Sequence, residues 1–130
     1  MSAAGTLKQF EKLRAVFAHN SLVPKRPAAT PDLPVRIVAF KSRREYDAFR
    51  VRPTADAYYI GSAERSYIVM PRPEEDDFTL AAHEYAHVAL RSGGAELPLW
   101  LSEGLAELFS TVRITSSGTR LGGAIPGRFR

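Results

Sequence analysis

The first part of the chain has hydrophobic residues at helical spacing, then a proline-rich stretch and a short apolar run. Over residues 6–18, leucine and phenylalanine recur every three or four positions among charged residues, which predicts an amphipathic helix. Residues 20–34 contain four prolines and are predicted as a loop. The run VRIVAF over 35–40 predicts a strand, and the S-x-x-E capping box after it begins a short helix over 42–50.

The second part of the chain alternates between strand-like runs and helices. The runs 57–60 and 66–70, with the turn between them, predict a β-hairpin. The next helix, over 78–90, is apolar on nearly every side, which predicts that it is buried. A Gly-Gly pair ends this helix, Pro98 begins another, and a Ser-Ser-Gly turn within 112–125 predicts a second hairpin. Together these elements predict an α+β fold with a mixed or antiparallel sheet.

Length and composition are those of an ordinary globular domain. The chain has 130 residues and a mass of 14.4 kDa, with 45% hydrophobic and 25% charged residues, so we expect a single domain over 1–130. It has no cysteine, which excludes disulfides and thiolate metal ligands. No apolar run is long enough to span a membrane, and the N-terminus lacks the apolar core of a signal peptide. We therefore expect a soluble protein, and the sequence leaves its compartment open.

An excess of basic residues raises the alternative of nucleic-acid binding. The net charge is +4 and the pI is about 9.7, values that nucleic-acid-binding domains often show. The arginines are scattered along the chain, however, and no nucleic-acid-binding motif accompanies them. A solvated surface or a preference for acidic substrates explains the excess equally well. No nucleic-acid partner is therefore expected.

The strongest chemical signal is the sequence HEYAH in the predicted buried helix. Its histidines, His83 and His87, lie one turn apart on the same face, so both imidazoles can bind one metal ion. Glu84 projects from the same half of that turn, where it can act as the general base of a zinc hydrolase. Asp76 and Asp77 precede the helix and suit its positively polarised N-terminal end.

A catalytic zinc ion takes three protein ligands, so the third must come from elsewhere in the chain. The remaining histidine, His19, lies far from the motif, whereas Glu103 lies in the second turn of the helix that Pro98 begins. Two helices joined by a short loop can pack face to face and bring this carboxylate to the histidines. Glu107 lies one turn further along, where it can accept the outer N–H of a ligand histidine. The alternative for Glu107 is a solvated helix face.

The HEYAH sequence and the sequence WLSEGLAE over 100–107 together resemble the motif pair of the gluzincin metallopeptidases. Within this family the chain resembles peptidases of aminopeptidase N type, whose third ligand lies in a similar W-L-x-E-G-[FL]-A-E sequence. It resembles still more closely a bacterial group of uncharacterised peptidase-like gluzincin domains with a compact catalytic core. The resemblance implies a small zincin-like fold with one Zn²⁺ ion. By position it implies zinc ligands His83, His87 and Glu103, a general base Glu84 and an outer support Glu107.

Departures from the family pattern limit what the resemblance implies. A metzincin site is excluded, because Leu90 and Gly93 occupy the positions of its glycine and third histidine. Residues 88–102, between the second histidine and the third ligand, are fewer than in the aminopeptidases, which predicts a tight loop between the helices. No exopeptidase signature precedes the HEYAH helix, and no tyrosine or histidine follows Glu103 to stabilise an oxyanion. We therefore expect a gluzincin core that is truncated at its C-terminus.

The predicted hairpin before the HEYAH helix corresponds, by the same resemblance, to one that binds substrate in gluzincins. There the edge strand lines the cleft and holds the substrate backbone by strand addition. By that correspondence Ala57, Tyr58 and Tyr59 would hold an extended peptide or protein substrate, and the tyrosine that faces the cleft would also shape a pocket. The alternative is a purely structural hairpin with its tyrosines in the core.

The predicted function is zinc-dependent hydrolysis of a peptide bond. In this reaction Glu84 takes a proton from the attacking water and delivers it to the leaving amine. Two alternatives remain. One is a zinc-bound but catalytically inactive binding or scaffold domain. The other is a metal-free domain whose buried histidines are satisfied by hydrogen bonds. Oligomeric state and cleavage specificity are left open.

Overall fold

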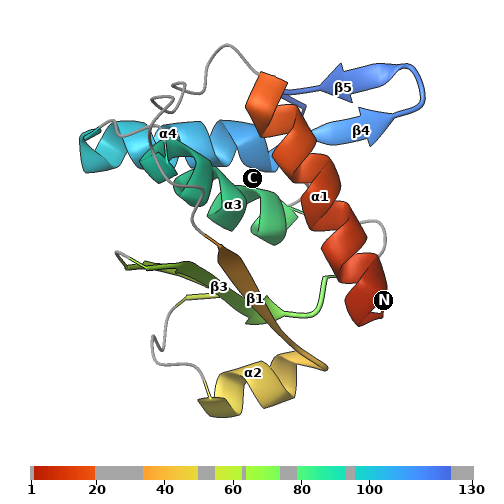
Figure 1. The fold of residues 1–130 in the computed structure, drawn as a ribbon, viewed down its shortest axis with the longest axis vertical. Coiled ribbons are helices and arrows are strands. Elements are labelled where there is room, and N and C mark those ends of the chain that lie inside the picture. The colour runs from red at the N-terminus through yellow and green to blue at the C-terminus, as the bar shows by residue number, and fades with distance from the viewer. Residues whose placement is uncertain are drawn as a thin grey trace, which may run out of the picture.

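The structure, a computed structural model, describes residues 2–19, 34–49, 55–62, 64–73, 79–92 and 96–123. Within these residues the order of elements is α1 (Ala3–His19), β1 (Val35–Phe40), α2 (Arg43–Phe49), β2 (Tyr58–Gly61), β3 (Ser66–Pro71), α3 (Thr79–Ser92), α4 (Leu99–Ser110), β4 (Arg113–Thr115) and β5 (Gly118–Arg120). The predicted α+β class is confirmed, and each predicted helix and strand is present (Figure 1). The predicted loop, apart from Pro34, and the capping residues Asp76 and Asp77 lie outside the described residues.

The larger sheet is mixed and has the strand order β1-β3-β2. Its central strand β3 is parallel to β1 and antiparallel to β2, which confirms the first predicted hairpin. Tyr58 pairs with Val69 and Tyr59 pairs with Ile68. Because neighbouring side chains of a strand point to opposite faces, Tyr58 and Val69 share one face and Tyr59 and Ile68 share the other.

Helices cover both faces of this sheet, with α1, α3 and α4 on one side and α2 on the other (Figure 1). On the side of α3, Ile68 and Met70 of β3 belong to the main hydrophobic core. Phe17 of α1 contacts both neighbouring helices, with ring centroids 5.4 Å from Tyr85 of α3 and 4.6 Å from Phe109 of α4. The apolar face of the amphipathic N-terminal helix therefore closes the core over α3 and α4.

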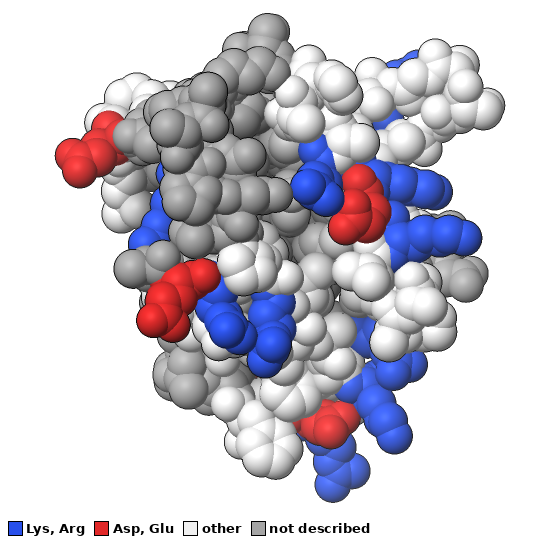
Figure 2. Space-filling view, in the orientation of Figure 1, with Lys and Arg blue, Asp and Glu red and all other residues white. Residues whose placement is uncertain are grey.

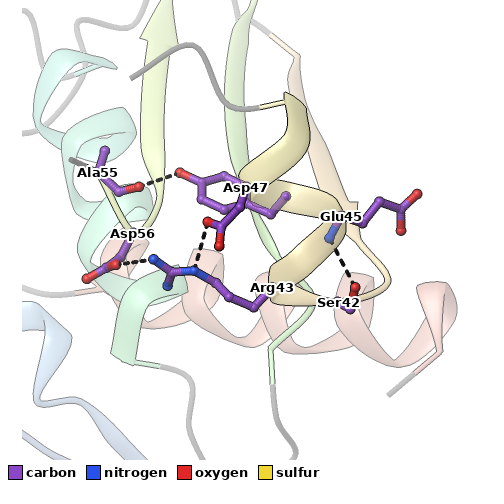
Figure 3. Close-up of polar contacts among 7 residues, drawn as sticks. Ser42, Arg43, Glu45, Asp47, Ala55 and Asp56 are labelled. Atoms are coloured by element: carbon purple, nitrogen blue, oxygen red, sulfur yellow. Dashed lines mark hydrogen bonds and ion pairs between the residues drawn. The ribbon is translucent and has the colours of Figure 1, made fainter. Parts of the chain in front are cut away.

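Helix α2 begins at the predicted capping box. Ser42 Oγ accepts a hydrogen bond from the backbone N–H of Glu45 at 3.1 Å (Figure 3), so the serine half of the box is present. The Glu45 carboxylate accepts a hydrogen bond from the backbone N–H of Lys41 at 3.2 Å, one residue before the N-cap that a standard capping box uses. The helix start is thus held by two side-chain contacts.

The other side chains of α2 hold the segment that leads into the edge strand β2 (Figure 3). Tyr46 is fully buried and donates its hydroxyl to the carbonyl oxygen of Ala55 at 2.8 Å. Arg43 pairs with Asp47 at 3.1 Å and with Asp56 at 2.6 Å, which raises the pKa of the guanidinium, chiefly through its hydrogen bond to Asp56. These contacts determine where the edge strand starts relative to the rest of the sheet.

Helices α3 and α4 form the predicted facing pair. Every residue from Leu80 to Leu90 is buried or half-buried, as the apolar pattern of this helix predicted. Pro98 directly precedes α4 and acts as its N-cap, and the first helical residue is Leu99. None of the described helices is both long and apolar enough to cross a membrane.

The last two strands form a separate antiparallel hairpin, which confirms the second predicted one. Arg113 pairs with Arg120, and Thr115 pairs with Gly118 across the Ser-Ser-Gly turn. Gly118 has φ of 143°, a value that glycine adopts far more readily than other residues. The backbone conformation at this position therefore explains why the turn contains a glycine.

Candidate metal centre

The candidate site is formed by side chains of the two facing helices α3 and α4. His83 and His87 lie one turn apart on α3, and Glu103 lies in the second turn of α4. Each of the three offers one ligand atom, and these atoms all lie within 4.8 Å of one another. Among the described residues, this is the group that could hold a metal ion, and His19 at the end of α1 is not part of it.

Glu103 contacts both histidines of this group. Its Oε2 lies 3.3 Å from Nε2 of His83, and its Oε1 lies 3.2 Å from Nε2 of His87. Ligand atoms at about 2.0–2.2 Å from a tetrahedral zinc ion lie roughly 3.3–3.5 Å from one another. Both contacts are about this long, but each uses a different carboxylate oxygen, so they show that the Glu103 carboxylate lies between the two imidazoles.

The opposite ring nitrogens have partners of their own on α4. Nδ1 of His83 lies 3.0 Å from Oε1 of Glu107, and Nδ1 of His87 lies 3.3 Å from Oγ of Ser102. Such outer contacts orient a ligand imidazole and determine which nitrogen carries its proton. Helix α4 thus provides a carboxylate between the two rings and a polar side chain behind each ring.

Spacing along the sequence predicts a role for Glu107 but does not single out Ser102. Glu107 lies four residues after Glu103, so the two share a helix face by geometry alone. Ser102 points about 100° away from Glu103, and its hydroxyl reaches His87 because of the way α4 packs against α3. The sequence feature that could have pointed to Ser102 is its position as a small polar residue directly before the predicted ligand Glu103.

The electrostatics of the group favour a cation between its atoms. Nδ1 of His83 faces Glu107 and Nε2 of the same ring faces Glu103, so a ring with a single N–H can donate to only one of these carboxylates. A cation at the other nitrogen, whether a proton or a metal ion, would satisfy both contacts. Burial is the largest cause that lowers the pKa of His87; proximity to His83 lowers it further, and Glu103 raises it. Burial thus favours the neutral imidazole, the form that binds metals.

The three side chains of the candidate metal-binding group differ in their exposure to solvent. The side chains of His83 and His87 are 16% and 15% exposed, whereas Glu103 is 49% exposed. The histidines therefore line the inner side of the site, and the carboxylate lies on the side open to solvent. Glu84 lies in the same turn of α3 and is only 8% exposed, but it is not a member of the metal-binding group.

The three predicted substrate residues lie in different surroundings. Ala57 precedes β2 and is buried in the main core, and Tyr58 packs with Tyr46 on the side of α2. Tyr59 lies beside the candidate metal-binding group. Its ring is nearly parallel to that of His87, with 16° between the planes and 6.2 Å between the centroids. Of the two tyrosines, Tyr59 is therefore the one that faces the site.

Basic side chains are spread over the face drawn in Figure 2 and form no single cluster on it. Acidic side chains lie between them on that face. Two of the arginines form ion pairs along their own helices, Arg14 with Glu11 and Arg43 with Asp47. This distribution agrees with the scatter of basic residues along the sequence.

The chain matches no protein-family model, no curated protein and no solved structure. Its function is therefore inferred from the pair of sequence motifs and the geometry of the candidate metal-binding group.

Proposed function

We propose that the protein is a metal-dependent hydrolase and, more specifically, a zinc peptidase of gluzincin type. The observation that carries the proposal is the approach of His83, His87 and Glu103, whose ligand atoms lie within 4.8 Å of one another. Two imidazoles and one carboxylate are the ligand set of catalytic zinc in several peptidases, where the fourth position stays open. The supports behind both imidazoles are a second feature of such centres.

The arrangement of elements supports a small zincin-like domain. The edge strand β2 and its partner β3 are followed by α3, the helix with the two histidines, and then by α4, the helix with the carboxylate. This order and the closeness of the ligand atoms agree with the resemblance of the two sequence motifs to gluzincins. The fold assignment is part of the proposal.

The residues of the chain have distinct roles in the proposed reaction. Bound zinc supplies Lewis acidity and lowers the pKa of water toward about 7. The Glu84 carboxylate takes a proton from water while the water oxygen forms a bond to the carbonyl carbon of the peptide. Glu84 then delivers this proton to the amide nitrogen as the C–N bond breaks, which leaves one carboxyl and one amine product. Glu107 and Ser102 hold the imidazoles through Nδ1 and keep Nε2 directed at the site.

The edge strand β2 supports a peptide as the substrate. Within the described residues β2 pairs with β3 on one side only, so its other side presents backbone groups to an added strand. Because Tyr59 of β2 lies next to His87, an added peptide would pass the metal-binding group.

Metal content and hydrolysis test the proposal together. We expect one zinc ion per chain by elemental analysis, and loss or strong weakening of zinc binding in Glu103→Ala. Glu96→Ala is the matched control, because Glu96 is an exposed glutamate just before α4 that does not belong to the group. The zinc-loaded chain should hydrolyse an unstructured, internally quenched peptide, and a chelator should abolish this activity until zinc is restored.

Three results would contradict the proposal in different ways. Iron in place of zinc would indicate one of the iron centres that also use two histidines and a carboxylate. Zinc binding without hydrolysis would indicate a binding or scaffold domain. Failure to bind any metal at saturating zinc would mean that the histidines are structural.

A further inference from the structure

Arg91 continues the line of the two metal-binding histidines along α3. His83, His87 and Arg91 are spaced four residues apart, so they lie on one face of the helix. Arg91 is therefore about one turn, roughly 6 Å along the helix axis, beyond His87. A long side chain in this position is near any substrate that is bound at the metal-binding group.

Tyr59 and Gly61 of the edge strand hold the Arg91 guanidinium in place. Nη1 of Arg91 donates a hydrogen bond to the Tyr59 hydroxyl at 3.1 Å, and the ring of Tyr59 lies against His87. A Cβ atom added to Gly61 would overlap both the guanidinium and the Tyr59 hydroxyl. The glycine thus leaves the space that the guanidinium occupies above the strand.

The positive charge of Arg91 has no carboxylate partner among the described residues. Its hydrogen-bond partner there is the neutral hydroxyl of Tyr59, which uses one of the five donors of a guanidinium. The Arg91 side chain is exposed, so the other donors can reach solvent or a ligand. A guanidinium fork matches the two oxygens of a carboxylate and binds them with two parallel hydrogen bonds.

We propose that Arg91 is a specificity residue that binds a carboxylate of the peptide substrate, an inference that rests on the proposed peptidase function. Arg91 lies six residues beyond the midpoint between His83 and His87, or about 9 Å along the helix. An extended peptide that runs along α3 covers this distance in about three residues. The carboxylate therefore belongs to a residue about two or three positions from the scissile bond. It is either an acidic side chain or the free C-terminus.

Binding of matched peptides tests the role of Arg91 without requiring turnover. Fluorescein-labelled unstructured peptides are compared in two kinds of pair: glutamate against glutamine at each position in turn, and a free C-terminus against an amide. Affinity is measured by fluorescence anisotropy with the zinc-loaded full chain carrying Glu84→Gln, which prevents cleavage. We expect the carboxylate member of one kind of pair to bind about three- to tenfold more tightly. This preference should shrink at high salt, because exposed charge pairs are screened.

Substitutions identify the residue that causes the preference. Arg91→Gln should abolish it and leave the affinity for the neutral peptides unchanged, whereas Arg91→Lys should keep part of it. Gly61→Ala should weaken it, because the new methyl group displaces the guanidinium without removing its charge. This variant also replaces Arg91→Gln if that protein fails to fold in a thermal melt. Arg36→Gln, at an exposed arginine of the other edge strand β1, is the matched control and should behave like the parent protein.

The outcomes separate the two carboxylate sources and the two proposals. A preference in the glutamate pairs identifies an acidic side chain, and a preference in the acid–amide pairs identifies the C-terminus. Equal affinity within every pair, or a preference that survives Arg91→Gln, would overturn the role of Arg91. In parallel, hydrolysis of neutral and acidic peptides at equal rates would contradict only this role. Absence of zinc or of all hydrolysis would instead contradict the peptidase proposal; if no zinc binds, the binding preference is measured on the metal-free chain.

Discussion

Removal of the Glu107 carboxylate is the sharpest test of how α4 supports the two histidines of the candidate metal centre. In Glu107→Ala, Nδ1 of His83 loses an acceptor that lies 3.0 Å away, while the proposed ligands His83, His87 and Glu103 stay in place. Loss of such an outer partner typically lowers metal affinity about 10- to 100-fold. Because the Glu107 side chain is 40% exposed, water can partly replace it, so we expect the lower end of this range. A tenfold loss corresponds to about 1.4 kcal/mol.

The same substitution should change the metal-free stability much less than the zinc affinity. The His83–Glu107 contact is partly exposed on the glutamate side, and exposed pairs contribute only about 0–1 kcal/mol to the free energy of unfolding. Glu107→Gln should lie between Glu107→Ala and the parent protein, because the amide oxygen still accepts the N–H but carries no charge.

Zinc affinity is measured by competition with a chromophoric chelator near neutral pH, and unfolding of the metal-free chain by urea titration. Glu11→Ala is the control, since Glu11 is an exposed helical glutamate with a single pair, to Arg14 at 3.5 Å, far from the site along the chain. Unchanged zinc affinity in Glu107→Ala would refute the support that we assign to Glu107. An equal loss in the Glu11 control would show that the effect is not specific to the site.

Three further predictions address the proton-transfer residue, the edge strand and the ligand helix. Glu84→Gln should keep zinc and lower kcat by about 10²- to 10⁴-fold, and near-normal turnover in a quenched-peptide assay would exclude Glu84 as the base. Tyr46→Phe removes the hydroxyl that donates to Ala55 at 2.8 Å and should lower the free energy of unfolding by about 0.5–1.5 kcal/mol in urea; no change would mean that this bond does not hold the start of β2. Gly104→Ala should raise the free energy of unfolding by about 0.8–1.0 kcal/mol and leave the zinc affinity unchanged, because alanine favours a helix more than glycine does and a Cβ there meets no atom within 4 Å. A loss of stability would contradict this prediction.

Local patterns in the sequence were sufficient to predict the helices, the strands and both hairpins. Of the predicted apolar face of α1, Phe10, Leu13 and Phe17 are buried in the core, whereas Leu7, which was predicted on the same face, is 57% exposed. Turn residues mark the hairpins, because adjacent strands joined by a short turn pair with each other. These predictions succeeded because each depends on the conformation of neighbouring residues.

Pairings between distant segments could not be predicted in this way. Strand β1 joins β3 in parallel, with Val35 opposite Ser66 and Phe40 opposite Pro71, and no local pattern specifies this register. The face of β2 that carries Tyr59 was likewise undetermined, because both tyrosines suit a buried environment. The packing of the sheet between α2 and α3 determines that Tyr59 lies on the face toward α3 and Tyr58 on the face toward α2.

For the candidate site, the sequence by itself determined which residues share a helix face. His83 and His87 on one helix, and Glu103 and Glu107 on the other, are each four residues apart, and this spacing aligns side chains in any α-helix. Only the tertiary structure decided which of these faces meet. The packing of α4 against α3 places Ser102 behind His87, and the packing of β2 against α3 joins Arg91 to Tyr59. Contacts of this kind depend on how two elements pack against each other, which is determined by the whole core and not by the spacing within either element.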